Sequence, residues 1–103
     1  ITTKQLIEDY NKNFLSSDEK YGGKKLLITG TISHYAQING IVGVYLKGDL
    51  RNESTIICLI DKTSQPDIYN KLKLGVNGTF EGIGEPKKDE KSIFIKNCLF
   101  KGF

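Results

Sequence analysis

Two tyrosines and two basic residues lie between residues 35 and 51 of this sequence, two lysines follow at residues 87 and 88, and together they could bind a ligand that carries both flat rings and phosphates. Aromatic rings stack on flat groups such as nucleobases, and Lys or Arg side chains contact phosphates. The candidate ligand-binding residues are Tyr35, Tyr45, Lys47, Arg51, Lys87 and Lys88. Nearby acids dilute the positive charge around them: Asp49, Glu53, Asp89 and Glu90. These acids argue against phosphate binding by the loops that contain them.

Two interpretations of Tyr45 remain open. The alternation of apolar and polar residues places Val42 and Val44 on one face of a strand and Tyr45 and Lys47 on the other. If the valines face a core, Tyr45 and Lys47 face outwards, where they could contact a ligand. Tyr45 could equally pack beneath a helix at the N-terminus, whose apolar side needs a partner.

No set of residues for catalysis, for a metal ion or for a cofactor is apparent. His34 is the only histidine, and its spacing from the serines, cysteines and acids indicates no catalytic partner. The glycines in residues 82–84 lack the helix and the Lys-Ser/Thr pair of a phosphate-binding loop. We therefore expect a protein that is not an enzyme, with no cofactor and no metal.

The composition is that of an ordinary globular protein. The chain has 103 residues, of which 38% are hydrophobic and 26% charged, and its formal net charge is +3. This length predicts one domain over residues 1–103, and the small charge argues against tight, purely electrostatic binding of nucleic acid. No apolar run approaches the roughly 20 residues of a membrane span. The chain lacks methionine, so we expect Ile1 to be an artificial or processing boundary.

Hydrophobic periodicity predicts one helix and then a series of strands. Leu6, Ile7, Tyr10 and Phe14 recur at three- and four-residue spacing, which indicates a helix over residues 2–21. From residue 24 the period changes to two, as in strands. A short helix is expected between the third and fourth strands. The expected strands and this short helix occupy residues 24–33, 41–47, 55–60, 64–74 (helix), 76–83 and 92–100.

This order of elements matches the five-stranded OB-fold, a Greek-key barrel with a short helix between its third and fourth strands. We expect the barrel to span residues 24–100. The first strand of such a barrel bends sharply, and Gly30 in mid-strand would relieve crowding there, often with a bulge. Gly78 and Gly82 in the adjacent fourth strand would serve the same curvature. In the alternative, an open meander, these glycines would only weaken the strands.

The two cysteines allow two interpretations. The third and fifth strands of an OB barrel run side by side, so Cys58 and Cys98 could be neighbours. A disulfide between them would close a loop of about 40 positions, worth roughly 4 kcal/mol in loop entropy, and would fit an extracytoplasmic protein. Alternatively, both are free thiols that fill the core.

Four segments between Glu8 and Phe100 resemble the tRNA_anti-like family. These segments are EDYNKNFLSSDEKYGGKKLLITGTIS, IICLI, KLKLGVNGTFEGIGE and IFIKNCLF. The resemblance implies the OB-fold, and nucleic-acid binding is the usual inference from it. Many family members resemble small secreted or lipid-anchored bacterial proteins of unknown role. The family supplies no catalytic residues.

Two functions therefore remain open. The working hypothesis is a non-catalytic OB-fold module that binds single-stranded nucleic acid. The alternative is a secreted or lipid-anchored module of the cell envelope that binds protein, peptide or glycan. The alternative rests on the near-neutral charge, the disulfide interpretation and the boundary at Ile1, which together favour an extracytoplasmic location over a cytoplasmic one.

Overall fold

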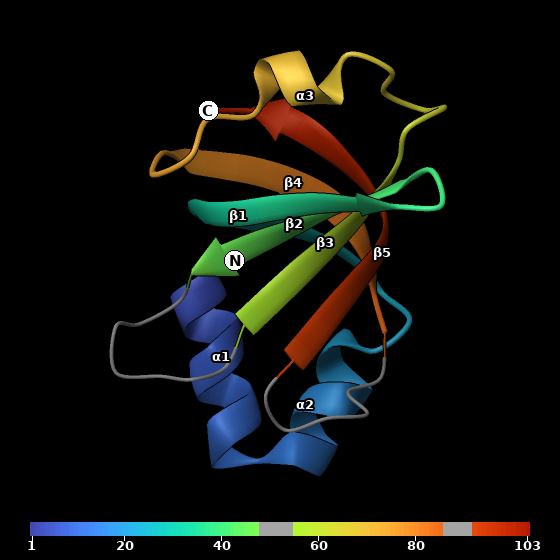
Figure 1. The fold of residues 1–103 in the computed structure, drawn as a ribbon. Coiled ribbons are helices and arrows are strands. Elements are labelled where there is room, and N and C mark those ends of the chain that lie inside the picture. The colour runs from blue at the N-terminus through green and yellow to red at the C-terminus, as the bar shows by residue number, and fades with distance from the viewer. Residues whose placement is uncertain (48–54, 86–91) are drawn as a thin grey trace.

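Alternating apolar residues build five strands that curl into a barrel, with helices at both of its ends (Figure 1). The fold is taken from a computed structural model, which describes residues 1–47, 55–85 and 92–103. In chain order the elements are α1 (Thr3–Lys12), α2 (Phe14–Tyr21), β1 (Lys25–Ile38), β2 (Ile41–Lys47), β3 (Thr55–Asp61), α3 (Ile68–Lys71), β4 (Asn77–Gly84) and β5 (Ser92–Gly102). None of the helices in these ranges is both long and apolar enough to cross a membrane.

The strands form a closed barrel in the order β1-β2-β3-β5-β4. Strands β3 and β5 pair in parallel, and the other neighbours are antiparallel. The long strand β1 pairs with β4 through its first half and with β2 through its second half, which closes the barrel. The prediction of an OB-fold barrel is confirmed, and the open meander is excluded.

Inward-facing side chains fill the barrel. Ile28, Ile32, Leu46, Ile56 and Phe80 have no exposed surface. They are drawn from β1, β2, β3 and β4, so the strands share one apolar core. Burial of such side chains stabilises the fold by roughly 1.5–3 kcal/mol each.

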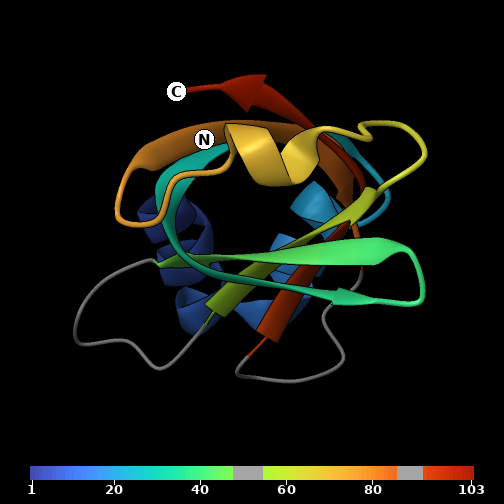
Figure 2. The same ribbon diagram turned by 45° about the horizontal axis from the view of Figure 1, so that its top comes forward.

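Helices close the two ends of this core. Leu6 and Ile7 of α1 are buried at one end, and Ile68 of α3 is buried with the same core cluster. Figure 2, which looks more nearly down the barrel, shows α3 lying across one end, away from α1 and α2. The helix α3 is a single turn, Ile68–Lys71, much shorter than the helix expected over residues 64–74.

The predicted N-terminal helix over residues 2–21 is in fact two helices. The break is at Asn13, whose extended backbone (φ −155°, ψ 101°) ends α1 and begins α2. The side-chain oxygen of Asn13 accepts a hydrogen bond from the Ser16 amide at 3.0 Å, as a helix N-cap does. Thr2 is the N-cap of α1, since its hydroxyl oxygen accepts a hydrogen bond from the Gln5 amide at 3.1 Å. The side chain of Phe14 lies outside what the structure describes.

Gly30 has a different role from the bulge that we expected there. It pairs in regular register with Gly78, and the register shift in β1 falls later, between Ile32 and His34. A Cβ atom at Gly30 would lie 2.4 Å from Cγ2 and 2.7 Å from Oγ1 of Thr3. The glycine is therefore needed because the first residue of α1 packs directly against the backbone of β1.

Candidate functional site

Four outward-facing side chains form a continuous row across the barrel. In the strand ladders His34 of β1 pairs with Tyr45 of β2, Tyr45 pairs with Ile57 of β3, and Ile57 pairs with Phe94 of β5. We call these four residues the outer row. The rings of His34 and Tyr45 are in contact, with centroids 5.4 Å apart and planes tilted by 57°. Three of the four side chains therefore present aromatic rings on one side of the molecule.

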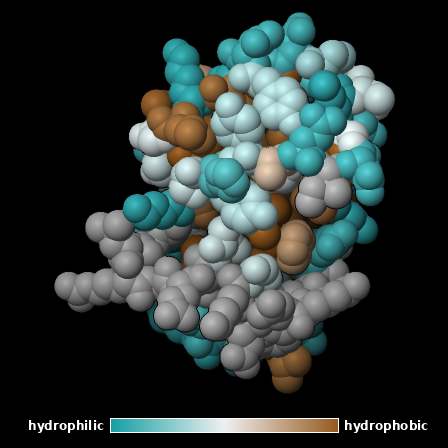
Figure 3. All heavy atoms as spheres, viewed as in Figure 1, coloured by the Kyte–Doolittle hydropathy of each residue, from teal (hydrophilic) through white to brown (hydrophobic). Residues whose placement is uncertain are grey.

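An apolar slot lies along this row. Its volume is about 210 Å³, and it is lined by Ala36, Ile41, Gly43, Tyr45, Ile57, Leu59 and Phe94. None of these residues carries a charge. Figure 3 views the barrel from this side, and brown, hydrophobic atoms are visible in the middle of the face between paler side chains. The slot is suited to a flat apolar group approaching from solvent.

Tyr45 is the expected ligand-binding residue that the structure places at the centre of this surface. It is half-buried and faces away from the core, between the buried Val44 and Leu46 of β2. Its ring borders the slot and contacts His34, so it does not pack beneath α1. The outward orientation predicted from the alternation is confirmed.

A one-residue bulge in β1 brings His34 to the outer row. Ile32 pairs with Leu46 and His34 with Tyr45, so Ser33 is an extra residue on the β1 side. Side chains alternate between the two faces of a strand, and one inserted residue exchanges the faces beyond it. The bulge therefore turns His34 outwards.

The same bulge turns Tyr35 inwards, which corrects the expected position of this residue. Tyr35 lies within β1 rather than in the first loop, and it pairs with the buried Val44. Its half-buried ring packs against the core, and its centroid lies 5.6 Å from that of Tyr69 in α3. Tyr35 is therefore separated from the outer row by the wall of the barrel.

Lys47 is the described basic residue among those that we expected to bind ligand. It is exposed at the end of β2, on the same face of the strand as Tyr45. Its backbone carbonyl accepts a hydrogen bond from Thr3 Oγ1 at 3.0 Å, which holds the end of β2 against α1. The other three basic candidates, Arg51, Lys87 and Lys88, lie outside the described residues.

Sequence reasoning missed three members of the outer row, which are His34, Ile57 and Phe94. Phe94 could have been found from the sequence. Side chains alternate between the two faces of a strand, so a strand with Ile93 and Ile95 facing the core has Phe94 facing outwards. His34 could not, because simple alternation places it on the same face as Ile32, and the bulge has no clear sequence signal.

A second, larger hollow lies on another side of the barrel. It has a volume of about 640 Å³ and is bordered by Lys25, Glu81, Leu99 and Lys101, among others. The carboxylate of Glu81 lies 2.6 Å from the Lys25 ammonium and 3.2 Å from the Lys101 ammonium. The hydrogen bond from Lys25, followed by that from Lys101, lowers the pKa of Glu81. Both lysines at this hollow are therefore ion-paired with the same carboxylate.

Cys58 and Cys98 are neighbours, as the barrel predicts, but they are not bridged in the structure. Both are free thiols in the core, with 0% and 1% of their surface exposed. The hydrogen bond with the Cys98 thiol, together with burial, raises the pKa of Cys58. Within the described parts of the chain, no three His, Cys, Asp or Glu residues are grouped so that they could hold a metal ion.

Solved structures of similar fold include a proposed nucleic acid-binding lipoprotein from Klebsiella pneumoniae subsp. pneumoniae MGH 78578. It is 17% identical, with a TM-score of 0.76, over 97% of this chain and 90% of that chain. Asparaginyl-tRNA synthetase from Pyrococcus horikoshii is 12% identical, with a TM-score of 0.57, over 81% of this chain and 20% of that chain. OBody AM1L10, bound to hen egg-white lysozyme, is 11% identical, with a TM-score of 0.59, over 82% of this chain and 85% of that chain. These similarities establish the fold alone.

No curated protein sequence matches this chain. The sequence pattern that defines the tRNA_anti-like family matches residues 1–99. The match runs from the start of α1 into β5, so it includes both the barrel and the outer row.

Proposed function

The chain belongs to the tRNA_anti-like family, and we propose that the outer row of its barrel binds single-stranded nucleic acid without catalysing a reaction. The observation that carries this proposal is the outer row itself, in which Tyr45 and Phe94 line an uncharged slot and His34 contacts Tyr45. The outer face of strands two and three is also where OB-fold barrels bind oligonucleotides. The fold and the side chains of this surface therefore support the same class of ligand.

The dimensions of the slot favour a single flat group as its occupant. Its volume of about 210 Å³ is below the roughly 300 Å³ at which pockets for whole small molecules begin. A base that is splayed out of a single strand has such a flat, accessible face, whereas a base inside a duplex is stacked on both sides. Stacking accepts any base, so the proposed binding depends little on sequence.

Lys47 adds the electrostatic part of the proposal. It extends from the same face of β2 as Tyr45, so a base on Tyr45 would bring its phosphate near the Lys47 ammonium. A lysine that contacts a phosphate releases a counterion, and binding then weakens as salt is raised. The similar barrel from K. pneumoniae, a proposed nucleic acid-binding lipoprotein, supports the same class of ligand.

A titration with fluorescently labelled single-stranded oligonucleotides tests this proposal by anisotropy, at low and at moderate salt. We expect Tyr45→Ala to weaken binding at least about 5-fold, because one base–aromatic stack contributes roughly 1–3 kcal/mol. The matched control is Phe103→Ala, which removes an aromatic ring that is 56% exposed and is not part of the outer row. This control should bind like the wild type.

Two results would count against the proposal. One is the absence of salt-sensitive binding up to high micromolar protein. The other is an equal loss of affinity in Tyr45→Ala and Phe103→Ala, which would make the effect unspecific to the outer row.

A second candidate function is a cell-envelope module that binds protein, peptide or glycan through the same slot. The uncharged lining of the slot favours it, because phosphate recognition needs charge and apolar contact does not. The similar OBody is bound to a protein, and the K. pneumoniae relative is a proposed lipoprotein, which supports an extracytoplasmic location. Peptide and glycan arrays probed with the wild type and Tyr45→Ala test this candidate. Tyr45-dependent array binding without oligonucleotide binding would replace the first proposal.

A further inference from the structure

The two cysteines lie where the parallel pairing between β3 and β5 ends. We call this pairing the seam of the barrel. The β3–β5 ladder has four residue pairs and stops where Cys58 pairs with Ile95. Beyond this point β3 continues only along β2, to Asp61, while β5 continues along β4, to Gly102. Cys98 belongs to this continuing part of β5. The seam between the two strands therefore loses its backbone hydrogen bonds next to the cysteine pair.

The backbone of β5 is distorted in a way that turns Cys98 into the core. Lys96 and Asn97 are both exposed, which breaks the alternation, and Cys98 is then 1% exposed. Asn97 has a φ of 52°, a left-handed conformation that non-glycine residues rarely adopt, and the β4–β5 register shifts here. Opposite it, Gly82 leaves room for the sulfur, because a Cβ atom there would lie 2.6 Å from Cys98 Sγ.

The two thiols contact each other inside this space. The Cys98 thiol donates a hydrogen bond to the Ile95 carbonyl at 3.2 Å and is also hydrogen-bonded with Cys58. Neither sulfur is accessible to solvent in the closed barrel, since the two residues are 0% and 1% exposed. A bridge would thus join two side chains that already meet, at the point where the backbone pairing between their strands ends.

We propose that Cys58 and Cys98 form a disulfide when the chain folds in an oxidising compartment, and that this bridge fastens the seam between β3 and β5. The oxidant is a small-molecule disulfide such as oxidised glutathione. One cysteine thiolate attacks it, which gives a mixed disulfide and releases one glutathione thiol. The second cysteine thiolate then attacks the protein sulfur of the mixed disulfide, and the protein disulfide forms as the second glutathione thiol leaves. The protein loses two hydrogens and the oxidant gains them.

Burial determines when this exchange takes place. Thiol–disulfide exchange needs access of the attacking sulfur to the oxidant. In the closed barrel both sulfurs are covered, so the bridge forms before the barrel closes or when it opens. Once formed, it is covered in the same way and resists reductants as long as the protein stays folded.

The test compares the wild-type protein after refolding from urea in two buffers, one with a glutathione redox mixture and one with a reductant. We expect the first sample to be a monomer, lighter by two hydrogen atoms, with no thiol available for alkylation after unfolding. Its near-ultraviolet circular dichroism should match that of the reduced sample. Its unfolding equilibrium constant should be roughly 700-fold smaller, because the bridge restricts the unfolded chain.

The single variants Cys58→Ala and Cys98→Ala are matched controls that should unfold alike in both buffers. If either fails to fold, the two samples of wild type still decide the matter. Disulfide-linked dimers as the only oxidised product would overturn the proposal. So would a bridged monomer that unfolds at lower urea than the reduced protein, because the bridge would then not fit the native seam.

Discussion

Thr3 and Gly30 form the contact that sets α1 against the barrel. Thr3 is 3% exposed, and its side chain occupies the space that a Cβ atom at Gly30 would fill. Its hydroxyl also donates to the carbonyl of Lys47 at the end of β2. One small polar side chain therefore joins α1 to both β1 and β2.

The substitution Gly30→Ala should destabilise the protein by about 1–3 kcal/mol, the usual range for overpacking. The added methyl group would lie 2.4 Å from Thr3 Cγ2, so either the helix or the strand must move. Urea unfolding measures the change. The control is Gly43→Ala, where the nearest atom to the new Cβ is Ile57 Cγ2 at 3.6 Å, an ordinary contact. Equal stabilities of the two variants would contradict this account of Gly30.

Gln65 covers part of the edge of β5 beyond Ile95, where the pairing with β3 has ended in the part of the chain that the structure describes. Its side-chain amide donates to the Phe100 carbonyl at 3.1 Å and its oxygen accepts from the Phe100 amide at 2.7 Å. The side chain therefore takes the place of a paired strand residue at this position. Unpaired strand edges expose backbone groups that can pair with other chains, so such cover has a protective effect.

We predict that Gln65→Ala lowers the free energy of unfolding by about 1–2 kcal/mol, because two part-buried backbone groups of Phe100 lose their partners. Chemical denaturation measures this decrease in the free energy of unfolding. Gln37→Ala is the matched control, since the Gln37 amide makes an exposed hydrogen bond with the Tyr69 hydroxyl that water can replace. A loss in Gln65→Ala no larger than that in the control would show that the edge does not depend on Gln65.

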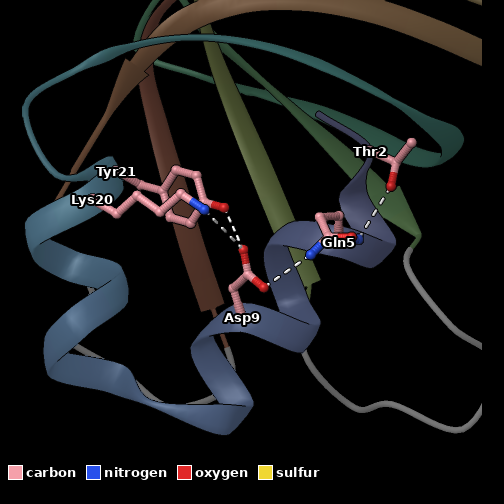
Figure 4. Close-up of polar contacts among 5 residues, drawn as sticks. All are labelled: Thr2, Gln5, Asp9, Lys20 and Tyr21. Carbon is pink, nitrogen blue, oxygen red and sulfur yellow. Dashed lines mark hydrogen bonds and ion pairs between the residues drawn. The ribbon is translucent and has the colours of Figure 1, made fainter.

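At the scale of elements, a polar cluster ties α1 to α2 (Figure 4). The Tyr21 hydroxyl donates to the carboxylate of Asp9, and Gln5 Nε2 donates to the same carboxylate at 2.9 Å. The Lys20 ammonium lies 3.9 Å from it. The bond from Tyr21 is the main cause that lowers the pKa of Asp9, although burial acts in the opposite direction. The cluster therefore stabilises the ionised form of Asp9 between the two helices.

The substitution Tyr21→Phe should reduce stability by about 1 kcal/mol near pH 7. The folded-state pKa of Asp9 is below the unfolded value of about 3.9, so the stabilisation is present above that value. It is lost as the pH falls through the folded-state pKa. The difference between wild type and variant should therefore shrink below about pH 4, as measured by urea unfolding across pH.

Tyr69→Phe is the control for this pH dependence. Its hydroxyl donates to the uncharged amide oxygen of Gln37 at 2.7 Å, so no carboxylate is involved. The effect of Tyr69→Phe should be the same at pH 3 and pH 7. A Tyr21→Phe effect that is equally independent of pH would contradict the coupling to Asp9.

The elements that the sequence predicts well are those with strong local signals. Asn39-Gly40 forms the turn between β1 and β2 with positive φ at both residues, 52° and 78°, as this dipeptide favours. The break at Asn13 was missed because the apolar spacing continues across it, although asparagine is a strong N-cap. The bulge at Ser33 was missed because its position depends on which β2 residues pair with β1, a tertiary property.

At the scale of the whole molecule, the barrel has two sides of different character. On one side lie the rings of the outer row and their uncharged slot. On the other, Glu81 pairs in the ladders with Leu27 and Leu99, and its carboxylate is held by two lysines. The first side offers rings to a ligand, whereas the charges of the second are already paired. We therefore propose the first side as the binding surface.

The face of a strand on which a side chain lies could be predicted only where the alternation of apolar and polar residues is unbroken. Tyr45 and Lys47 lie in the regular strand β2, and their outward orientation follows from their neighbours. Tyr35 and His34 lie beyond the bulge in β1, so their faces are exchanged. The grouping of His34, Tyr45 and Phe94 from three strands depends on the strand order of the barrel, which no local pattern contains.

The most direct test is a nuclear magnetic resonance titration of the ¹⁵N-labelled protein with a short oligothymidine, followed through the backbone amide shifts. We expect saturable shifts centred on Gly43, Tyr45, Ile57 and Phe94, with the amides of Leu27, Glu81 and Leu99 unchanged. Shifts confined to the Glu81 side, or no shifts at all at high micromolar oligothymidine, would contradict this expectation.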